Sequence, residues 1–140
     1  MSHEQTGKLS VILLCIDYRF WPHALPLLEK KYGLFDLIEI AGASKSLVSP
    51  LENEDRVTLL ENIGISVKLH HPERLVLTNH TDCGAYGGSN KFTSHDEEIA
   101  FHTEELHKAK VIAQEKFPEL KVETLIIDKN EKDEILLIEV

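Results

Sequence analysis

Three short runs rich in Val, Ile and Leu constrain the fold of this chain more than any other feature. They cover residues 8–15, 35–41 and 75–79, and the first is almost continuously apolar. Runs of this kind are typical of strands buried on both faces, as in a parallel sheet. Two further runs, 121–128 and 135–140, lie so close together that we expect an antiparallel hairpin.

Helical segments separate the first three runs. Pro22 suits the first turn of a helix and Gly33 its C-terminal end, while Pro26 either kinks this helix or delays its start. A second helix is predicted to begin at Ser49, as the N-cap, with Pro50 at the first helical position and Glu52 completing a capping box.

Both of the later helices are expected to present an apolar stripe to the sheet. In the second helix the stripe comprises Val57, Leu60, Ile63 and Val67. The third helix opens at Ser94 with another capping box, and its stripe comprises Ile99, Leu106, Ala109, Ala113 and Phe117.

The order of the elements predicts the fold class. Three strand–helix units followed by two strands indicate an α/β protein with helices on both faces of the sheet. We expect an open, mostly parallel sheet of order 2-1-3-4, with a fifth antiparallel strand. The 140 residues fit a single domain, 1–140, with no repeat or linker.

Soft metal-ligating side chains stand at the ends of two of these strands. Cys15 ends the first strand, while His80 and Cys83 follow the third. In such sheets, ligands collect at the carboxyl ends of the strands where the strand order reverses, here between strands 1 and 3. Two thiolates and one imidazole suit zinc, and three ligands leave the fourth position open. His70 and His71 remain possible fourth ligands.

Asp17 and Arg19 follow Cys15 at alternate positions. If the backbone stays extended, both side chains project to the side of Cys15 and face the metal together. An arginine can hold a carboxylate with two parallel hydrogen bonds. The carboxylate of Asp17 could then accept a proton from metal-bound water, or occupy the fourth metal position itself.

The pattern Cys15-x-Asp17-x-Arg19, followed by His80-x-x-Cys83-Gly, resembles the β-class carbonic anhydrases. The similarity covers roughly the first two thirds of the chain, in a fold that agrees with the rest. It implies that Cys15, His80 and Cys83 bind zinc and that Asp17 and Arg19 form a catalytic pair. It also implies reversible hydration of carbon dioxide to bicarbonate by zinc-bound hydroxide, in a homodimer or higher homo-oligomer.

The chain also departs from the family pattern. It has Glu39-Ile-Ala-Gly-Ala43 where the family tends to have Arg-x-Ala-Gly-Asn, and Gln5 has no context that matches the family's substrate-orienting glutamine. Two alternatives stay open beside carbonic anhydrase activity. One is a carbonyl sulfide or carbon disulfide hydrolase on the same site, and the other is a non-catalytic zinc-binding protein that keeps the fold.

Several other side chains allow both a functional and an ordinary interpretation. His23, His95 and His102 are candidates for proton export by position, but solvated surface histidines are the favoured interpretation. Tyr86 either lines the pocket or packs, and Asp82 is expected to face solvent or cap its loop. The two cysteines as inert buried thiols, or as a redox pair without Cys-x-x-Cys spacing, are disfavoured alternatives.

Composition limits the partners. The formal net charge of -9 argues against binding nucleic acid or an anionic membrane, which needs clustered Lys and Arg. Neither a signal region at the start nor a run of membrane-spanning length is evident, so we expect a cytoplasmic protein. In that reducing compartment a disulfide is a poor explanation for two cysteines. The expected partners are a small-molecule substrate and further copies of the chain.

Overall fold

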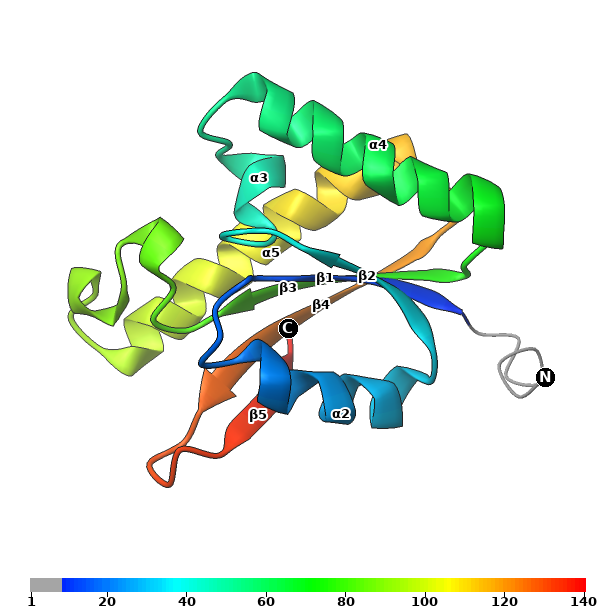
Figure 1. Cartoon of the computed structure of the whole chain (residues 1–140). Helices are drawn as coiled ribbons and strands as arrows, with labels where there is room; N and C mark the ends of the chain where they lie inside the picture. Colours follow the sequence, from blue (N-terminus) through cyan, green and yellow to red (C-terminus); the bar gives the residue numbers. More distant parts are fainter. Residues whose placement is uncertain (1–8) are drawn as a thin grey trace.

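The computed structural model describes residues 9–140, so Gln5 and the predicted start of the first strand at Lys8 lie outside the described residues. One sheet with the order β2-β1-β3-β4-β5 forms the centre of the molecule (Figure 1). Its first four strands are parallel and β5 is antiparallel to β4, which confirms the predicted fold class. The strands are β1 (Ser10–Leu14), β2 (Phe35–Glu39), β3 (Arg74–His80), β4 (Lys121–Lys129) and β5 (Ile135–Glu139).

Helices cover both faces of this sheet (Figure 1). On one face lies α2 (Trp21–Tyr32), and on the other lie α3 (Lys45–Val48), α4 (Asn53–His70) and α5 (His95–Lys116). The inner strands β1, β3 and β4 are buried on both sides because their residues alternate between two cores. Ile12 and Leu14 pack in the core that includes α2, whereas Val11 and Leu13 pack in the core that includes α4 and α5.

The starts of α2 and α5 agree with the sequence. Pro22 lies in the first turn of α2, and Pro26 neither ends the helix nor delays its start. The backbone amide of Gly33 closes the helix by donating to the carbonyl of Glu29 at 2.7 Å. At α5 the Ser94 hydroxyl caps the helix by accepting the amide of Glu97 at 3.0 Å.

The predicted start of α4, with Ser49 as N-cap, is wrong by three residues. Residues 45–48 form the short helix α3 instead, and the amide of Ser49 closes that helix by donating to Lys45 O. The helix α4 begins at Asn53 with Glu52 as N-cap, whose amide donates to the Asp55 carboxylate at 3.1 Å. Ser49 already serves as the C-cap of α3, so the acidic residues after Pro50 provide the cap of α4.

The buried face of α4 is therefore rotated relative to the predicted stripe. Ile63 is fully buried, but Leu59 is buried where the prediction had Val57, which is 47% exposed. Leu60 and Val67 lie at the margin of the core. Within residues 9–140, no helix is both long and apolar enough to span a membrane.

Two connections begin at the carboxyl ends of β1 and β3. The segment from Cys15 to Phe20 joins β1 to α2, and the segment from Thr81 to Ser94 joins β3 to α5 through two single-turn helices, η1 (Gly84–Tyr86) and η2 (Ser89–Lys91). The neighbouring strands β1 and β3 pair in register from Ser10 with Arg74 to Leu13 with Leu77. Both connections therefore leave the sheet at the same edge, the one formed by the carboxyl ends of the parallel strands. This is the place predicted from the reversal of strand order.

Candidate metal centre

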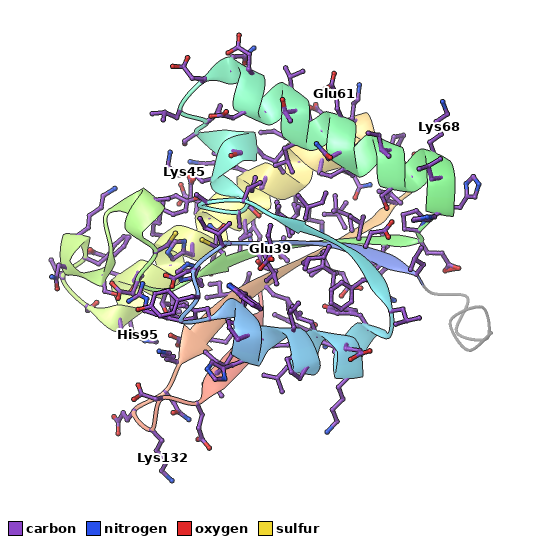
Figure 2. The ribbon with its side chains drawn as sticks, viewed as in Figure 1. Glu39, Lys45, Glu61, Lys68, His95 and Lys132 are labelled. Atoms are coloured by element: carbon purple, nitrogen blue, oxygen red, sulfur yellow. The ribbon has the colours of Figure 1, made fainter. Side chains whose placement is uncertain are left out.

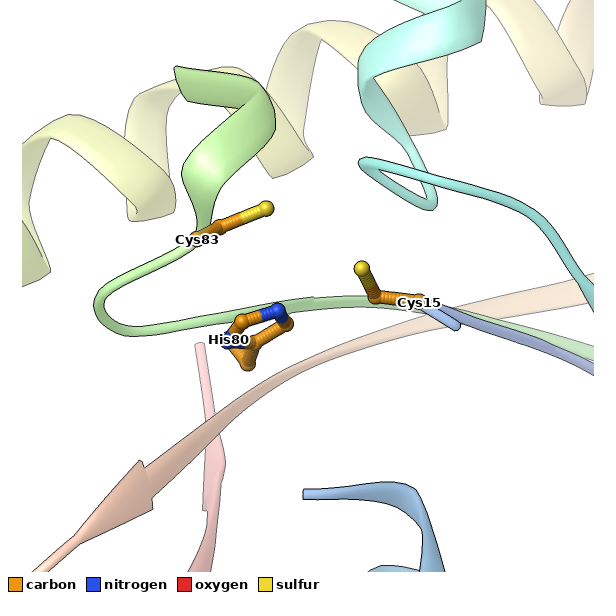
Figure 3. A group of neighbouring side chains, drawn as sticks. All are labelled: Cys15, His80 and Cys83. Carbon is orange, nitrogen blue, oxygen red and sulfur yellow. The ribbon is translucent and has the colours of Figure 1, made fainter. Parts of the chain in front are cut away.

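Cys15, His80 and Cys83 come together at this edge of the sheet (Figure 3). Their ligand atoms all lie within 4.8 Å of one another. Cys15 follows the last residue of β1, His80 is the last residue of β3, and Cys83 precedes η1. His80 and Cys83 are almost completely buried. The structure thus unites the three side chains that the sequence selected.

The imidazole of His80 is oriented as a metal ligand would be. Its Nδ1 lies 2.6 Å from the carbonyl oxygen of Thr81, which can only accept, so Nδ1 carries the proton. Its Nε2 is then a free lone pair, and this atom is buried without a hydrogen-bond partner. Phe20 stacks against the ring at a centroid distance of 4.2 Å. A hydrogen bond from the second ring nitrogen is the usual support of a ligating histidine.

The two thiols share one proton. The hydrogen bond from Cys83, helped by contacts from His80 and the Gly42 amide, lowers the pKa of Cys15 to about 4. The same interaction with Cys15, together with burial, raises the pKa of Cys83. The Gly42 amide donates to the Cys15 sulfur at 3.3 Å. One thiolate is thus stabilised in the absence of an ion, and a second anion so close by would need a cation between them.

Gly42 was missed as a site residue. Its φ of +79° is a left-handed conformation that favours glycine, and an added Cβ would lie 3.0 Å from the Cβ of Ala85. The backbone at Gly42 is therefore able to approach η1 closely and direct its amide at Cys15. The Gly42 in the sequence, directly after a predicted strand, was the available signal.

Asp17 and Arg19 form a close ion pair beside the imidazole. Arg19 Nε donates to Asp17 Oδ1 at 3.0 Å, and Arg19 Nη2 donates to Asp17 Oδ2 at 2.6 Å. Hydrogen bonds from Arg19 lower the pKa of Asp17 to about 2. Asp17 Oδ2 lies 3.7 Å from His80 Nε2, so the carboxylate borders the position of a metal.

The two side chains meet for a different reason than predicted. The backbone does not remain extended, because the amides of Phe20 and Trp21 both donate to the carbonyl of Asp17 and form a turn. The Arg19 amide also donates to Asp17 Oδ1 at 2.9 Å. The turn, rather than strand alternation, folds Arg19 back onto Asp17.

Asp82 caps its loop, which was one of the two predictions for this residue. It also binds Arg19, a partner that the sequence did not indicate. Its Oδ1 accepts the Ser89 amide at 2.8 Å. Its Oδ2 accepts Arg19 Nη1 at 2.8 Å. These hydrogen bonds, from Ser89 first and then from Arg19, lower the pKa of Asp82. Arg19 therefore lies between two carboxylates.

The three candidate proton carriers lie in different environments. His23 is exposed, and His95 is mostly exposed with its Nε2 2.8 Å from the Asp128 carboxylate. His102, by contrast, is fully buried, so its interpretation as a surface histidine is wrong. Burial lowers the pKa of His102 to about 4 and keeps it neutral. Tyr86 packs edge-on against this ring at 5.0 Å, which supports the packing interpretation.

The structure excludes His70 and His71 from the site. His70 is the last residue of α4, and its Nδ1 lies 2.7 Å from Asp36 near the start of β2. Asp36 pairs with Val11, at the opposite end of β1 from Cys15. His71 follows directly as the C-cap of the same helix. Among residues 9–140, the cluster that could hold a metal comprises three side chains only.

Glu39, which the sequence marked only as a departure from the family pattern, lies close enough to Cys15 to interact with it electrostatically. It is the last residue of β2, and it is labelled near the middle of the ribbon in Figure 2. Burial raises the pKa of Glu39, and the negative charge of Cys15 raises it further. Its Oε2 is buried without a hydrogen-bond partner. Glu39 occupies the position where the resemblance leads one to expect an arginine.

Comparison with known proteins agrees with this geometry. Residues 5–137 match a family model described as "Putative carbonic anhydrase". The chain belongs to this carbonic anhydrase family. It is 32% identical over 124 residues to an uncharacterized protein of Rickettsia bellii, a match that covers 84% of this chain and 75% of that one. An uncharacterized protein of Rickettsia conorii has the same identity, and 66% of its length is covered.

Solved β-carbonic anhydrases share the fold. The chain matches the enzyme CafA of Aspergillus fumigatus with a TM-score of 0.62 at 13% identity, over 99% of this chain and 83% of that one. It matches a tetrameric β-carbonic anhydrase of Sordaria macrospora with a TM-score of 0.61 at 14% identity, over 98% and 85%. An apo form of carbon disulfide hydrolase gives 0.55 at 14% identity, over 96% and 82%.

Proposed function

We propose that this member of the carbonic anhydrase family is a zinc enzyme that reversibly hydrates carbon dioxide to bicarbonate. One observation carries the proposal: the Nε2 of His80 is buried without a partner, among two thiols and beside the Asp17 carboxylate. A buried lone pair without a partner costs free energy that a bound ion would recover. Family membership supports the same reaction.

The donor set fits zinc. Two cysteine sulfurs and one imidazole nitrogen are the ligand types that zinc prefers, and three protein ligands leave a position for a reactant. The lowered pKa of Cys15 means that this ligand is already a thiolate near neutral pH. When bound, zinc supplies Lewis acidity that activates water for attack on carbon dioxide.

The role that we assign to Asp17 follows from its charge and position. With a pKa of about 2 it remains a carboxylate at neutral pH, and so it can accept a hydrogen bond from the reacting water. Arg19 fixes the carboxylate through two side-chain nitrogens, which selects the oxygen that faces the site. Asp17 and Arg19 are therefore the proposed catalytic residues.

Stopped-flow measurement of carbon dioxide hydration by the zinc-loaded protein tests this function. We expect a rate well above the buffer rate, and a fall in kcat/KM of about a hundredfold in Asp17→Asn. Asp96→Asn, a change of an exposed carboxylate in the first turn of α5, is the matched control and should be silent. A rate equal to that of buffer, or an unaffected Asp17→Asn variant, would contradict the proposal.

A second candidate reaction is hydrolysis of carbonyl sulfide or carbon disulfide at the same site. Its support is the structural similarity to carbon disulfide hydrolase. Sulfide release from either compound, measured on the same zinc-loaded preparation, separates the two activities. Zinc binding without either activity would leave the third alternative, a non-catalytic zinc-binding protein.

We also propose that the protein acts in the cytoplasm as a homodimer or larger homo-oligomer. Both edge strands carry exposed leucines, Leu37 on β2 and Leu136 on β5, and an open apolar edge favours association. A structural neighbour is described as tetrameric. Light scattering during size-exclusion chromatography tests the oligomer, and a mass of one chain at micromolar concentration would contradict it.

A further inference from the structure

We propose that Asp82 is a positioning residue that fixes Arg19 and, through Arg19, holds the Asp17 carboxylate in place beside the metal position. The inference deepens the proposed function, on which it rests for the role of Asp17. It starts from the ion pairs of one guanidinium with two carboxylates from different connections of the sheet.

Arg19 uses all three of its side-chain nitrogens in this bridge. Toward Asp17 it presents Nε, at 3.0 and 3.2 Å from the two oxygens, and Nη2 at 2.6 Å. Toward Asp82 it presents Nη1, at 2.8 Å from Oδ2, and Nη2, at 2.9 Å from the backbone carbonyl. The two groups thus hold adjacent edges of one planar guanidinium and share its Nη2, so movement of Arg19 away from either group breaks contacts.

Asp82 is itself fixed independently of Arg19. Its φ is +56°, and its Oδ1 accepts the Ser89 amide at 2.8 Å. Its own amide donates to Oε2 of Glu98 at 2.7 Å, and Glu98 is buried in α5, where it also accepts the Ser89 hydroxyl at 2.8 Å. An added Cβ at Gly88 would approach Asp82 Oδ1 to 3.2 Å. Because hydrogen bonds with η2 and α5 hold Asp82, little entropy is lost when it binds Arg19.

Without this anchor, Arg19 would be tied mainly to a residue two positions away in the same turn. Asp17 and Arg19 could then move together, since a cavity of about 500 Å³ borders Arg19 and Asp82 and leaves space for the guanidinium. Asp82 lies between His80 and Cys83 in sequence, so its bond to Arg19 sets the Asp17 carboxylate relative to the ligands. With Asp17 Oδ2 only 3.7 Å from His80 Nε2, a small displacement changes what this oxygen can reach.

The exchange rate of the Arg19 Nε–H with water, measured by NMR on the full chain with and without zinc, tests the anchor. This proton is donated to Asp17, so its protection reports whether Asp82 keeps the guanidinium in place against Asp17. The chain has three arginines, so Arg56 and Arg74 supply two internal references, and Arg19→Lys assigns the signal. Both references donate from Nε within the fold, to Leu47 O and to Glu123. We expect Asp82→Ala to raise the Arg19 exchange rate by at least about tenfold and to leave the other two unchanged.

Two further variants separate positioning from a general loss of structure. Asp82→Asn keeps one oxygen for the Ser89 amide, and the backbone carbonyl at this position still accepts Arg19 Nη2. Its NH2 group, which cannot accept, replaces the acceptor of Arg19 Nη1, so its Arg19 exchange rate should lie between those of wild type and Asp82→Ala. Asp96→Asn, the exposed carboxylate of α5, should have no effect. If all three arginine signals change in Asp82→Ala, that variant has lost structure generally. The exchange rate of Arg19 in Asp82→Asn then decides whether Asp82 anchors Arg19.

Three results would overturn the inference: an unprotected Arg19 signal in the wild type, an Arg19 rate unchanged by Asp82→Ala, or equal rates in Asp82→Asn and wild type. The kinetics of carbon dioxide hydration then test the effect on function. Asp82→Ala should lower kcat by a larger factor than it lowers the zinc content of the protein. A protected, Asp82-dependent Arg19 in a protein that hydrates no carbon dioxide would refute the proposed function but leave the anchor standing.

Discussion

The buried neutral imidazole of His102 makes a quantitative prediction about stability and pH. His102 is fully buried and its Nδ1 lies 3.1 Å from the amide nitrogen of Asn79. Its Nε2 has no hydrogen-bond partner and lies 3.9 Å from Oε2 of Glu98. Burial lowers the pKa of this histidine to about 4 from an ordinary value of 6.5. In the unfolded chain the same histidine takes up its proton near pH 6.5.

The sign of the effect follows from proton uptake. Between pH 6.5 and 4 the unfolded state binds a proton at His102 that the folded state does not bind, so folding stability falls as pH falls. The contribution of His102 is a loss of about 2 kcal/mol by pH 5 and about 3 kcal/mol by pH 4, relative to pH 7. His102→Gln removes this titration and should therefore flatten the pH dependence.

Urea denaturation of the metal-free protein at several pH values from 7 to 4.5 provides the assay. The difference in free energy of unfolding between wild type and His102→Gln should change by about 2 kcal/mol between pH 7 and pH 5. His107→Gln, a change of an exposed histidine on the same helix, controls for the loss of an ordinary imidazole. Parallel pH curves for wild type and His102→Gln would refute the argument that burial keeps His102 neutral.

Three shorter predictions concern the thiol, a helix cap and the core. Iodoacetamide should label Cys15 in the metal-free protein at a rate almost constant from pH 8 to 6, because the pKa of this thiol is about 4. Labelling of an ordinary thiol would slow nearly a hundredfold over this range, and that result would contradict the lowered pKa. In denaturant titrations, Ser94→Ala should lower the free energy of unfolding by about 1 kcal/mol, and Ser49→Ala by less than about 0.5 kcal/mol. A larger loss in Ser49→Ala than in Ser94→Ala would favour the N-cap predicted at Ser49. Leu77→Ala should cost about 2–5 kcal/mol in the same titrations, against less than about 0.5 for the exposed Leu51→Ala, and equal losses would contradict the assigned core.

The sheet could be predicted because its order follows from local patterns. The apolar runs of β1 and β3 are long enough to indicate burial on both faces, and the short turn before Ile135 allows only an antiparallel partner. Once β1 and β3 are neighbours, Cys15 and His80 must lie at one edge. The metal cluster therefore needed no information beyond strand order and residue type.

The remaining features depend on backbone conformation that the sequence does not reveal. The bond between Arg19 and Asp82 joins residues 63 positions apart and needs both the turn after Asp17 and the φ of +56° at Asp82. The direction of the Gly42 amide likewise depends on a left-handed φ. At α4, two overlapping cap signals compete, and only packing decides that Ser49 closes α3 while Glu52 opens the next helix.

The most direct test of the central proposal is the coordination of the bound metal. X-ray absorption at the zinc edge, on protein with its metal content determined, measures ligand types and distances together. We predict one zinc per chain with two sulfur ligands at about 2.3 Å and one nitrogen at about 2.0–2.1 Å, completed by one further light atom. Loss of one sulfur in Cys83→Ser would assign the shell to the cluster of Cys15, His80 and Cys83. A protein without zinc, or a zinc shell without sulfur, would contradict the account.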